Sequence, residues 1–409
     1  MSVFITIIVT CAHICIYCRQ ISQHDQYLPQ LLNQRVYQFD NIQYHKRFII
    51  IPGLFQGIVF TGFLRVWSVD KLSQSAQESE KRVAHVIAPA RLHLGFIDMN
   101  GGLGREFGSL GVCLADIFTH VSAIPSADIV IQGPSSHRAS LYAGRILEHL
   151  NIQHGAEITI HESIPEHAGL GSGTQLSLAV GCAIAALYEK KINPDQIAVI
   201  MDRGARSGIG VGAFSRGGFL VDGGRGENTE LPPIISHMNF PEAWRFVLVF
   251  DNQLQGVHGP SEKKVFQNLT PMSERITERL CRLVLMQVLP ALAEEDCERF
   301  GSAISEIQRL VGDHFAPAQG GRYCSRLVSE VLPWMLGQGA AGIGQSSWGP
   351  TGFALYANET QAYQAVKAAR EKWNSESRLK FKVCKARNQK AEITTEKLNQ
   401  GSSFKLKNF

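Results

Sequence analysis

A glycine-rich stretch that opens directly into an apolar segment constrains this chain more than any other feature. Residues 164–175 read Ile-Pro-Glu-His-Ala-Gly-Leu-Gly-Ser-Gly-Thr-Gln, and residues 176–188 have the apolar character of a buried helix. Glycine permits positive φ and a close approach of a ligand to the backbone, and the amides at a helix N-terminus attract phosphate. The same pattern, taken alone, also fits an ordinary loop before a helix. The candidate phosphate-binding residues are Gly169, Gly171, Ser172, Gly173 and Thr174.

The composition is that of a globular protein with material for two cores. The chain has 409 residues, of which 44% are hydrophobic and 19% are charged. Its net charge of +4 is too small to demand a nucleic-acid partner, so we expect small anionic substrates and no nucleic acid. Most of the nine cysteines stand singly in apolar runs, which is typical of reduced core thiols and predicts a cytoplasmic protein.

The first 82 residues differ in character from the rest of the chain. They are rich in Gln, Ile and Tyr with little periodicity, so we interpret residues 1–82 as an extra N-terminal segment, either disordered or a mistranslated leader. Residues 1–18 are apolar but lack the basic start of a signal peptide, and we expect no stable membrane association. Cys11, Cys15 and Cys18 have the spacing of the iron–sulfur cluster motif of radical SAM enzymes. We interpret this spacing as coincidence, because roughly sixty residues cannot build the barrel that radical SAM chemistry needs.

A regular strand pattern begins near residue 83. Residues 88–98 alternate in polarity, which predicts Arg91, His93 and Gly95 on one face of a strand that ends at Asp98. The other face is predicted to carry Leu92, Leu94 and Phe96. One face of this strand is therefore polar and is a candidate wall of a site.

Two further glycine-rich loops follow the first. Residues 206–219 form a turn that is bracketed by Arg206 and Arg216, and residues 337–352 form a loop that contains Trp348. The other elements are predicted as helices over residues 140–150, 194–203, 273–336 and 359–373, and as strands over residues 112–124, 157–162, 244–250 and 380–385. A loop over residues 251–262 carries His258 and Glu262.

These motifs, in this order, resemble the GHMP kinase superfamily. Residues 88–91 match its opening strand, residues 165–174 its phosphate loop and residues 339–352 its C-terminal glycine loop. Within the superfamily, the chain is similar to the beta-ribofuranosylaminobenzene 5'-phosphate synthase family. That similarity is carried by residues 91–101, 166–175 and 344–351, and the resemblance covers residues 83–385.

The resemblance implies an α+β, GHMP-kinase-like fold with two domains. Residues 83–238 would form an N-terminal domain like domain 2 of ribosomal protein S5, which contains the phosphate-binding loop. Residues 239–390 would form a ferredoxin-like α+β C-terminal domain, and residues 391–409 a polar tail.

One departure from the kinases supports the narrower resemblance. Many of these kinases have an Asp base in a Ser-Gly-x-Asp motif, and this chain has Gly210 at the position of that carboxylate. Glycine cannot take a proton, which argues against a kinase. Some family kinases lack the Asp, so an ATP-dependent small-molecule kinase stays an alternative, as does a catalytically silent ligand-binding member.

The synthase family joins phosphoribosyl pyrophosphate to 4-aminobenzoate in tetrahydromethanopterin biosynthesis, with release of pyrophosphate and carbon dioxide. The resemblance therefore implies these two small-molecule substrates and Mg2+, and it leaves open 4-hydroxybenzoate as the acid and a homodimer as the assembly.

For this reaction the site must hold a polyanion, a ribosyl cation-like state and an aromatic acid. The catalytic candidates are Arg91, His93, Asp98 and Arg206. The other candidates are Arg216 for phosphate, Trp348 and His258 for the substrate, and Thr174 and Glu262 for the metal. Trp348 fits a core position equally well, and Arg216 fits a solvated surface equally well.

Overall fold

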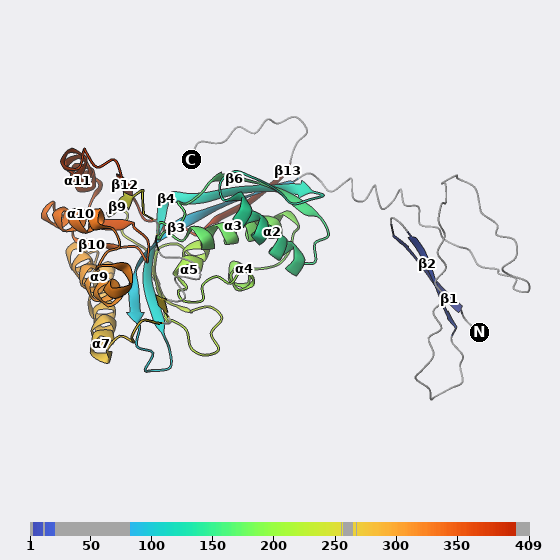
Figure 1. The fold of residues 1–409 in the computed structure, drawn as a ribbon, viewed down its shortest axis with the longest axis horizontal. Helices are drawn as coiled ribbons and strands as arrows, with labels where there is room; N and C mark the ends of the chain where they lie inside the picture. Colours follow the sequence, from blue (N-terminus) through green and yellow to red (C-terminus); the bar gives the residue numbers. More distant parts are fainter. Residues whose placement is uncertain are drawn as a thin grey trace, which may run out of the picture. The chain divides into compact units, whose positions relative to one another are not determined.

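The computed structural model describes residues 3–10, 13–20, 82–254, 256, 265, 266 and 268–397. The chain divides into two units, residues 1–74 and residues 75–409. In the first unit, β1 (Val3–Thr10) pairs antiparallel with β2 (His13–Gln20) (Figure 1). Of the residues 1–81 that precede β3, the structure describes only this pair of strands. Cys11 and the side chains of Cys15 and Cys18 lie outside the described residues.

The second unit begins with a seven-stranded sheet. Its main path runs β13-β3-β4-β6-β5, and β7 and β8 extend it from β4. Only the pair of β5 and β6 is parallel among the pairs of this sheet. The strands are β3 (Arg82–Asp98), β4 (Phe107–Ser126), β5 (Val130–Gln132), β6 (Gly155–Glu162), β7 (Phe219–Asp222), β8 (Ile234–Met238) and β13 (Glu392–Lys397).

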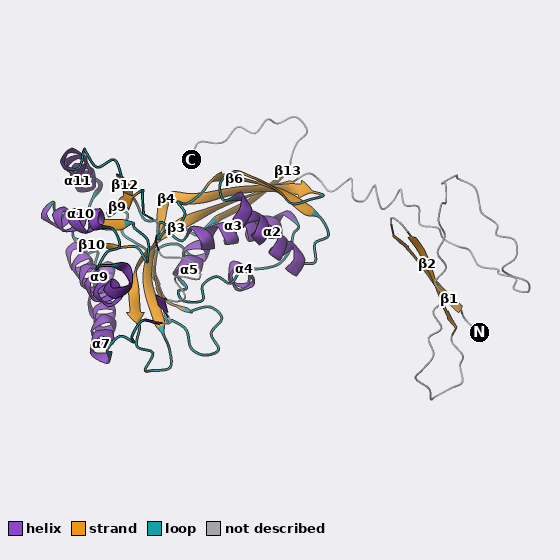
Figure 2. Ribbon diagram, in the orientation of Figure 1, coloured by secondary structure: helices purple, strands orange, loops and turns teal. Residues whose placement is uncertain are grey.

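Helices cover one face of this sheet (Figure 2). They are α2 (Ser136–His149), α3 (Ser172–Leu187), α4 (Pro194–Ile200) and α5 (Ile209–Ser215). Because α3 contains no charged residue and is apolar on every side, it packs as the central, buried helix. The small side chains Ala84, Val86 and Ala88 of β3 face it within one core cluster.

The C-terminal part is a four-stranded antiparallel sheet in the order β10-β11-β9-β12. The order and the crossovers are those of a ferredoxin-like fold, as predicted. Its strands are β9 (Arg245–Asp251), β10 (Gly342–Gln345), β11 (Gly352–Tyr356) and β12 (Leu379–Cys384). The helical elements are α7 (Glu274–Leu283), the π-helical η1 (Val284–Val288), α8 (Leu289–Ala293), α9 (Cys297–Gln319), α10 (Arg326–Gly337) and α11 (Glu359–Lys372). None of the described helices is both long and apolar enough to cross a membrane.

The predicted alternation along β3 is interrupted. The register of β3 against β4 shifts between Pro89 and Arg91 and again between His93 and Gly95, and Gly95 has φ of 135°. The ring centres of His93 and Phe96 are therefore 4.8 Å apart, on the same side of the strand. Strict alternation had placed these two residues on opposite faces.

The segment predicted as a polar tail is also different. Although β13 is exposed along its length, its backbone pairs with β3 from Glu392 opposite Ile87 to Lys397 opposite Arg82. It forms the edge of the sheet, where polar side chains are usual.

Candidate functional site

The first glycine-rich loop ends at the N-terminus of α3, as the sequence predicted. The N-cap is Gly171, whose φ of 83° favours glycine, and no side chain caps the helix. The amides of Ser172, Gly173 and Thr174 therefore belong to an uncapped first turn. This helix end can donate to an anion.

Three arginines surround this helix end. A Cβ atom at Gly171 would lie 3.2 Å from Cγ of Arg91, and one at Gly173 would lie 2.7 Å from Nη2 of Arg138 and 3.5 Å from Nη1 of Arg203. The absence of side chains at the two glycines thus leaves room for guanidinium groups beside the helix amides. Charge and dipole both favour a polyanion here.

Neighbouring groups hold these arginines in place. Nη1 of Arg138 donates to Glu166 at 2.8 Å, and hydrogen bonding to Ser135 and the Arg138 charge lower the pKa of the Glu166 carboxyl. Arg203 donates to the hydroxyl of Tyr142 and lies over that ring at 5.3 Å from its centre. Its buried Nε has no hydrogen-bond partner within the described chain, so it retains capacity to donate.

The third glycine-rich loop packs directly on the first. Oγ of Ser346 donates to the carbonyl oxygen of Gly169 at 2.6 Å and accepts from the backbone N–H of His93 at 3.0 Å. A Cβ atom at Gly349 would lie 2.3 Å from backbone atoms of Ala168 and Gly169. The two loops therefore meet backbone against backbone, and only glycine permits this contact.

A cavity lies on the other side of this contact. Its walls are formed by His93, Gly95, Phe96, Gln308, Val311, Gly312, Phe315, Gln319, Arg322, Gln345, Ser347 and Trp348. The rings of Phe315 and Trp348 are 4.5 Å apart between centres, so the cavity has an aromatic side. The volume of this cavity is about 30 Å³.

Two buried nitrogen atoms in the cavity wall lack a hydrogen-bond partner among the described residues. They are Nε2 of His93, which is 2% exposed, and Nε1 of Trp348, which is 5% exposed. Burial, and next the nearby Arg91 charge, hold the pKa of His93 well below its usual value, so the imidazole is neutral at neutral pH. Buried groups that are unpaired in this way suit a polar ligand that enters the cavity.

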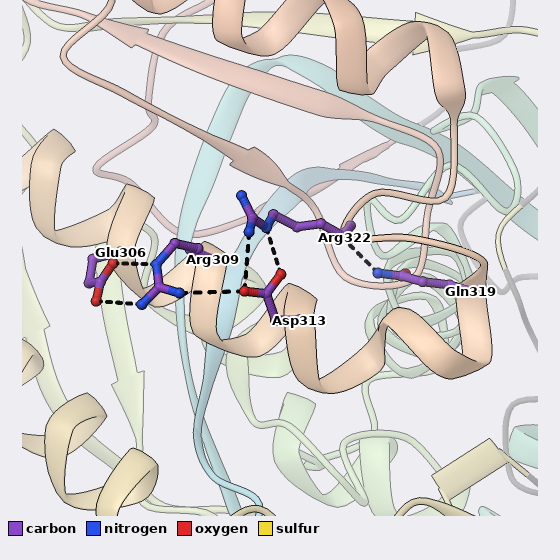
Figure 3. Close-up of polar contacts among 5 residues, drawn as sticks. All are labelled: Glu306, Arg309, Asp313, Gln319 and Arg322. Carbon is purple, nitrogen blue, oxygen red and sulfur yellow. Dashed lines mark hydrogen bonds and ion pairs between the residues drawn. The ribbon is translucent and has the colours of Figure 1, made fainter.

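Arg322, in the segment after α9, also lines this cavity. Its Nε and Nη2 atoms donate to Asp313 at 2.7 and 3.1 Å, and Asp313 in turn accepts from Arg309 (Figure 3). A Cβ atom at Gly312 would lie 2.7 Å from Cγ of Arg322. This ion-pair network therefore fixes a cation beside an aromatic wall.

Arg206 lies against the aromatic residues outside this wall. Its guanidinium carbon is 4.7 Å from the ring centre of Phe266. Phe266 in turn contacts Trp348 and Phe96, with ring centres 5.5 and 6.0 Å away. Arg206 therefore contacts the cavity wall through the ring of Phe266.

Gly210, at the position where many GHMP kinases have an Asp base, lies beside the phosphate loop. A Cβ atom at Gly210 would lie 3.2 Å from Cγ2 of Thr174, and the Gln175 side chain donates to the Gly210 carbonyl at 2.7 Å. The turn before it is held by buried Asp222, which accepts from the Gly208 N–H at 2.9 Å and also from Ser109, Ser207 and Gly224. Burial raises the pKa of Asp222 and these hydrogen bonds oppose the rise.

Four predicted site residues are not placed in this group. Asp98 accepts from the N–H groups of Asn100 and Gly101 in a turn, roughly 23 Å along β3 from Arg91. Arg216 is exposed at the C-terminal end of α5, the end opposite Gly210. His258 and Glu262 lie outside the described residues.

Arg138 and Arg203 are the site residues that the sequence did not reveal. Arg138 lies in the first turn of α2 and Arg203 follows α4, so neither belongs to a glycine-rich motif. The nearest sequence signal is Gly173, because a glycine at this position leaves room for guanidinium groups.

Two family models match the chain. The model for the GHMP kinases N terminal domain matches residues 139–218, and the model for the GHMP kinases C terminal domain matches residues 288–375. The first match contains the phosphate loop and the second contains the Trp348 loop.

Curated relatives match a larger share of the chain. A protein of Archaeoglobus fulgidus named beta-ribofuranosylphenol 5'-phosphate synthase is 35% identical over 320 residues, which are 75% of this chain and 97% of that protein. A protein of the same name from Methanothermobacter thermautotrophicus is 33% identical over 289 residues, 65% of this chain and 87% of that protein. The mevalonate kinase of Methanococcus jannaschii superposes with a TM-score of 0.55 over 74% of this chain and 98% of its own, at 14% identity, so this likeness concerns the fold alone.

Proposed function

The chain belongs to the beta-ribofuranosylphenol 5'-phosphate synthase family of the GHMP kinase superfamily, and from that membership we propose its reaction. It is an enzyme that transfers a phosphoribosyl group. Its proposed substrates are phosphoribosyl pyrophosphate and a 4-substituted benzoate, and its products are the C-ribosylated ring, pyrophosphate and carbon dioxide. The relatives' name denotes a ribosylated phenol, which favours 4-hydroxybenzoate over 4-aminobenzoate as the acid.

One observation carries the proposal: a polyanion site and an aromatic cavity lie side by side. Arg91, which lies against Gly171, and His93, which lines the cavity, are two residues apart on β3. That separation is about 7 Å along a strand. Ser346 bridges the two sites, because it bonds both Gly169 and His93.

The end of α3 is the proposed site of the pyrophosphate group. Arg91, Arg138 and Arg203 would neutralise its charge while the loop amides donate to its oxygens. Preorganised donors of this kind stabilise charge that develops on a leaving group. Arg206 is proposed to orient the rest of the sugar phosphate from beyond Phe266.

The cavity is the proposed site of the aromatic acid. Phe96, Phe315 and Trp348 offer ring contacts, and the unpaired nitrogen of His93 offers a polar contact. Arg322 supplies a positive charge at the wall for a carboxylate. The cavity volume of about 30 Å³ is small for a benzoate, so we expect the side chains around it to move apart when the acid binds.

The proposed chemistry balances without a general base. The bond between ribosyl C1 and pyrophosphate breaks, and its electron pair leaves with the pyrophosphate. The ring carbon that bears the carboxylate donates an electron pair to C1, and the bond to the carboxylate then breaks. Its electrons restore the aromatic ring as carbon dioxide departs. No proton leaves a ring carbon, so Gly210 in place of a kinase carboxylate is compatible with this reaction.

We propose that Mg2+ enters with the pyrophosphate as its counter-ion. The Thr174 hydroxyl, in the first turn of α3, is an oxygen ligand of the type that Mg2+ takes. The loop carboxylate, Glu166, already accepts from Ser135 and Arg138. The metal would therefore be held mainly by substrate oxygens, Thr174 and water, and it would neutralise the leaving group.

We also propose that the enzyme is cytoplasmic. The described cysteines are free thiols, which supports this proposal.

The experiment that tests the proposal is product formation with each acid. Purified protein is incubated with Mg2+, phosphoribosyl pyrophosphate and either 4-hydroxybenzoate or 4-aminobenzoate, and the products are identified by mass spectrometry. We expect the ribosylated phenol 5'-phosphate to form faster than the ribosylated aminobenzene. Formation of neither compound, together with ATP-dependent phosphorylation of a small alcohol, would instead favour a kinase.

A further inference from the structure

Three histidines from three neighbouring strands meet on the sheet of the N-terminal part. They are His85 on β3, His120 on β4 and His161 on β6. Their chain neighbours Val86, Val121 and Ile160 belong to the core cluster under the helices. Because side chains alternate along β3 and β4, His85 and His120 point to the opposite, outer face. The pairing of β4 and β6 is irregular at His161, but His161 is exposed and its Nε2 lies 2.7 Å from Oγ of Ser122, the residue opposite His85, so His161 lies on the same face. They are thus separate from the candidate active site at the end of α3.

The imidazole rings lie close enough to share a ligand. One nitrogen atom of each ring can be chosen so that the chosen atoms all lie within 4.8 Å of one another. The ring centres are 5.7 Å apart for His85 and His120, and 4.5 Å apart for His120 and His161. In the part of the chain that the structure describes, no other group of three His, Cys, Asp or Glu side chains comes this close.

We propose that these three histidines bind a divalent transition-metal ion, with Zn2+ as the best fit. Three imidazoles leave a fourth position open in a tetrahedral Zn2+ site, which water can fill. Zn–N bonds of about 2.0–2.1 Å place ligand nitrogens about 3.4 Å apart, so rotation of the side chains has to close the present separation by somewhat more than 1 Å. His161 is exposed, so an ion can enter from solvent.

The residues that neighbour these imidazole rings are compatible with metal binding. Oγ of Ser122 lies 2.7 Å from Nε2 of His161, which can fix that ring. Burial lowers the pKa of His85, and the carboxylate of Glu396 on β13 only partly opposes this.

The test is a Zn2+ titration of the full-length, untagged protein after chelator dialysis. Calorimetry compares the unchanged protein with His120→Ala and His161→Ala, and with His154→Ala, an exposed histidine just before β6, as the matched control. Cysteines of the chain also bind Zn2+, so the informative quantity is the difference between variants. The unfolding temperature with and without Zn2+ gives a second measurement, since an ion that ties β3, β4 and β6 stabilises the sheet.

We expect the unchanged protein and His154→Ala to bind one Zn2+ more than either cluster variant, or to bind that ion at least about tenfold more tightly, since even an outer-shell partner is worth about 10- to 100-fold. The Zn2+-dependent rise in unfolding temperature should disappear in both cluster variants. Equal Zn2+ stoichiometry, affinity and thermal response in all four proteins would overturn the proposal. His161→Ala keeps the test valid if His120→Ala fails to fold, because His161 is exposed.

Discussion

At the scale of single residues, the charge of the candidate site comes from arginines that are far apart in the sequence. Arg91, Arg138 and Arg203 reach one helix end from a strand, a helix and a turn. Glu166 offsets one of these charges and also fixes Arg138 in position. A pyrophosphate bound at the proposed site would therefore meet an excess of positive charge.

Replacing Arg138 tests this arrangement. We expect Arg138→Ala to lower kcat/KM for phosphoribosyl pyrophosphate by about 10- to 100-fold, because a hydrogen bond to a charged group is worth about 1.5–3 kcal/mol. Arg145→Ala is the matched control, since Arg145 lies on the same helix, is exposed and pairs with Asp202. Equal kinetics for the two variants in steady-state assays would remove Arg138 from the site.

A second prediction concerns the contribution of His93 to the pH dependence of the free energy of unfolding. Its pKa in the folded protein lies well below that of the unfolded chain, so between these two values the unfolded chain binds a proton that the folded protein does not. Acidification below pH 6.5 should therefore lower the free energy of unfolding. In His93→Phe this dependence should be weaker by up to about 1.4 kcal/mol per pH unit. Denaturant titrations between pH 5 and 7 measure both slopes, and identical slopes would contradict the neutral, buried imidazole.

The sequence predicted only some of the residues of this site. It predicted Arg91, His93, Trp348 and the loop glycines because each belongs to a local pattern. It did not predict Arg138 and Arg203, because their approach to Gly173 depends on how α2 and α4 pack on α3. Asp98 was grouped with Arg91 because both belong to the segment, residues 91–101, that carries the family resemblance, and a shared motif does not give the distance along the strand.

At the scale of elements, the candidate site depends on the contact between two glycine-rich loops. Ser346 and Gly349 of one loop meet Gly169 of the other with almost no side-chain atoms between the backbones. This contact fixes both the phosphate loop and the Trp348 wall of the cavity. A substitution in one loop should therefore change substrate binding at both candidate sites.

Gly349→Ala tests this coupling. Its new methyl group would lie 2.3 Å from backbone atoms of Ala168 and Gly169, so the loops must separate. We expect a lower unfolding temperature, with an overpacking cost of about 1–3 kcal/mol, and weaker binding of both substrates by calorimetry. Gly337→Ala, at the end of α10, is the control because no other atom lies within 4 Å of its added Cβ. Unchanged affinity for both substrates in Gly349→Ala would show that the contact is not needed.

Most elements follow from local sequence signals, and the exceptions have identifiable causes. The apolar run after the glycine loop became α3, and the ferredoxin-like strand order was implied by the resemblance. The bulge at Gly95 was missed, because a bulge depends on the partner strand β4 as much as on β3. The strand β13 was missed because an edge strand with exposed polar residues resembles a tail.

At the scale of the whole molecule, a kinase-like fold is combined with a site that lacks the kinase base. One core cluster joins Leu92 and Leu110 of the first sheet to Phe300 and Ile307 of α9, so the two sheets are not independent cores. The phosphate loop is presented by the N-terminal part, and most of the cavity by the C-terminal part. The proposed reaction uses both, with a polyanion that leaves and a ring that attacks.

The central claim is that carbon dioxide and pyrophosphate leave in the same reaction. The most direct measurement supplies the full-length protein with Mg2+, phosphoribosyl pyrophosphate and carboxyl-labelled 4-hydroxybenzoate, without ATP, and counts both products. We predict labelled carbon dioxide and pyrophosphate in equal amounts, with both falling together in Arg138→Ala. Release of pyrophosphate without labelled carbon dioxide, or no release of either product unless ATP is present, would contradict the account.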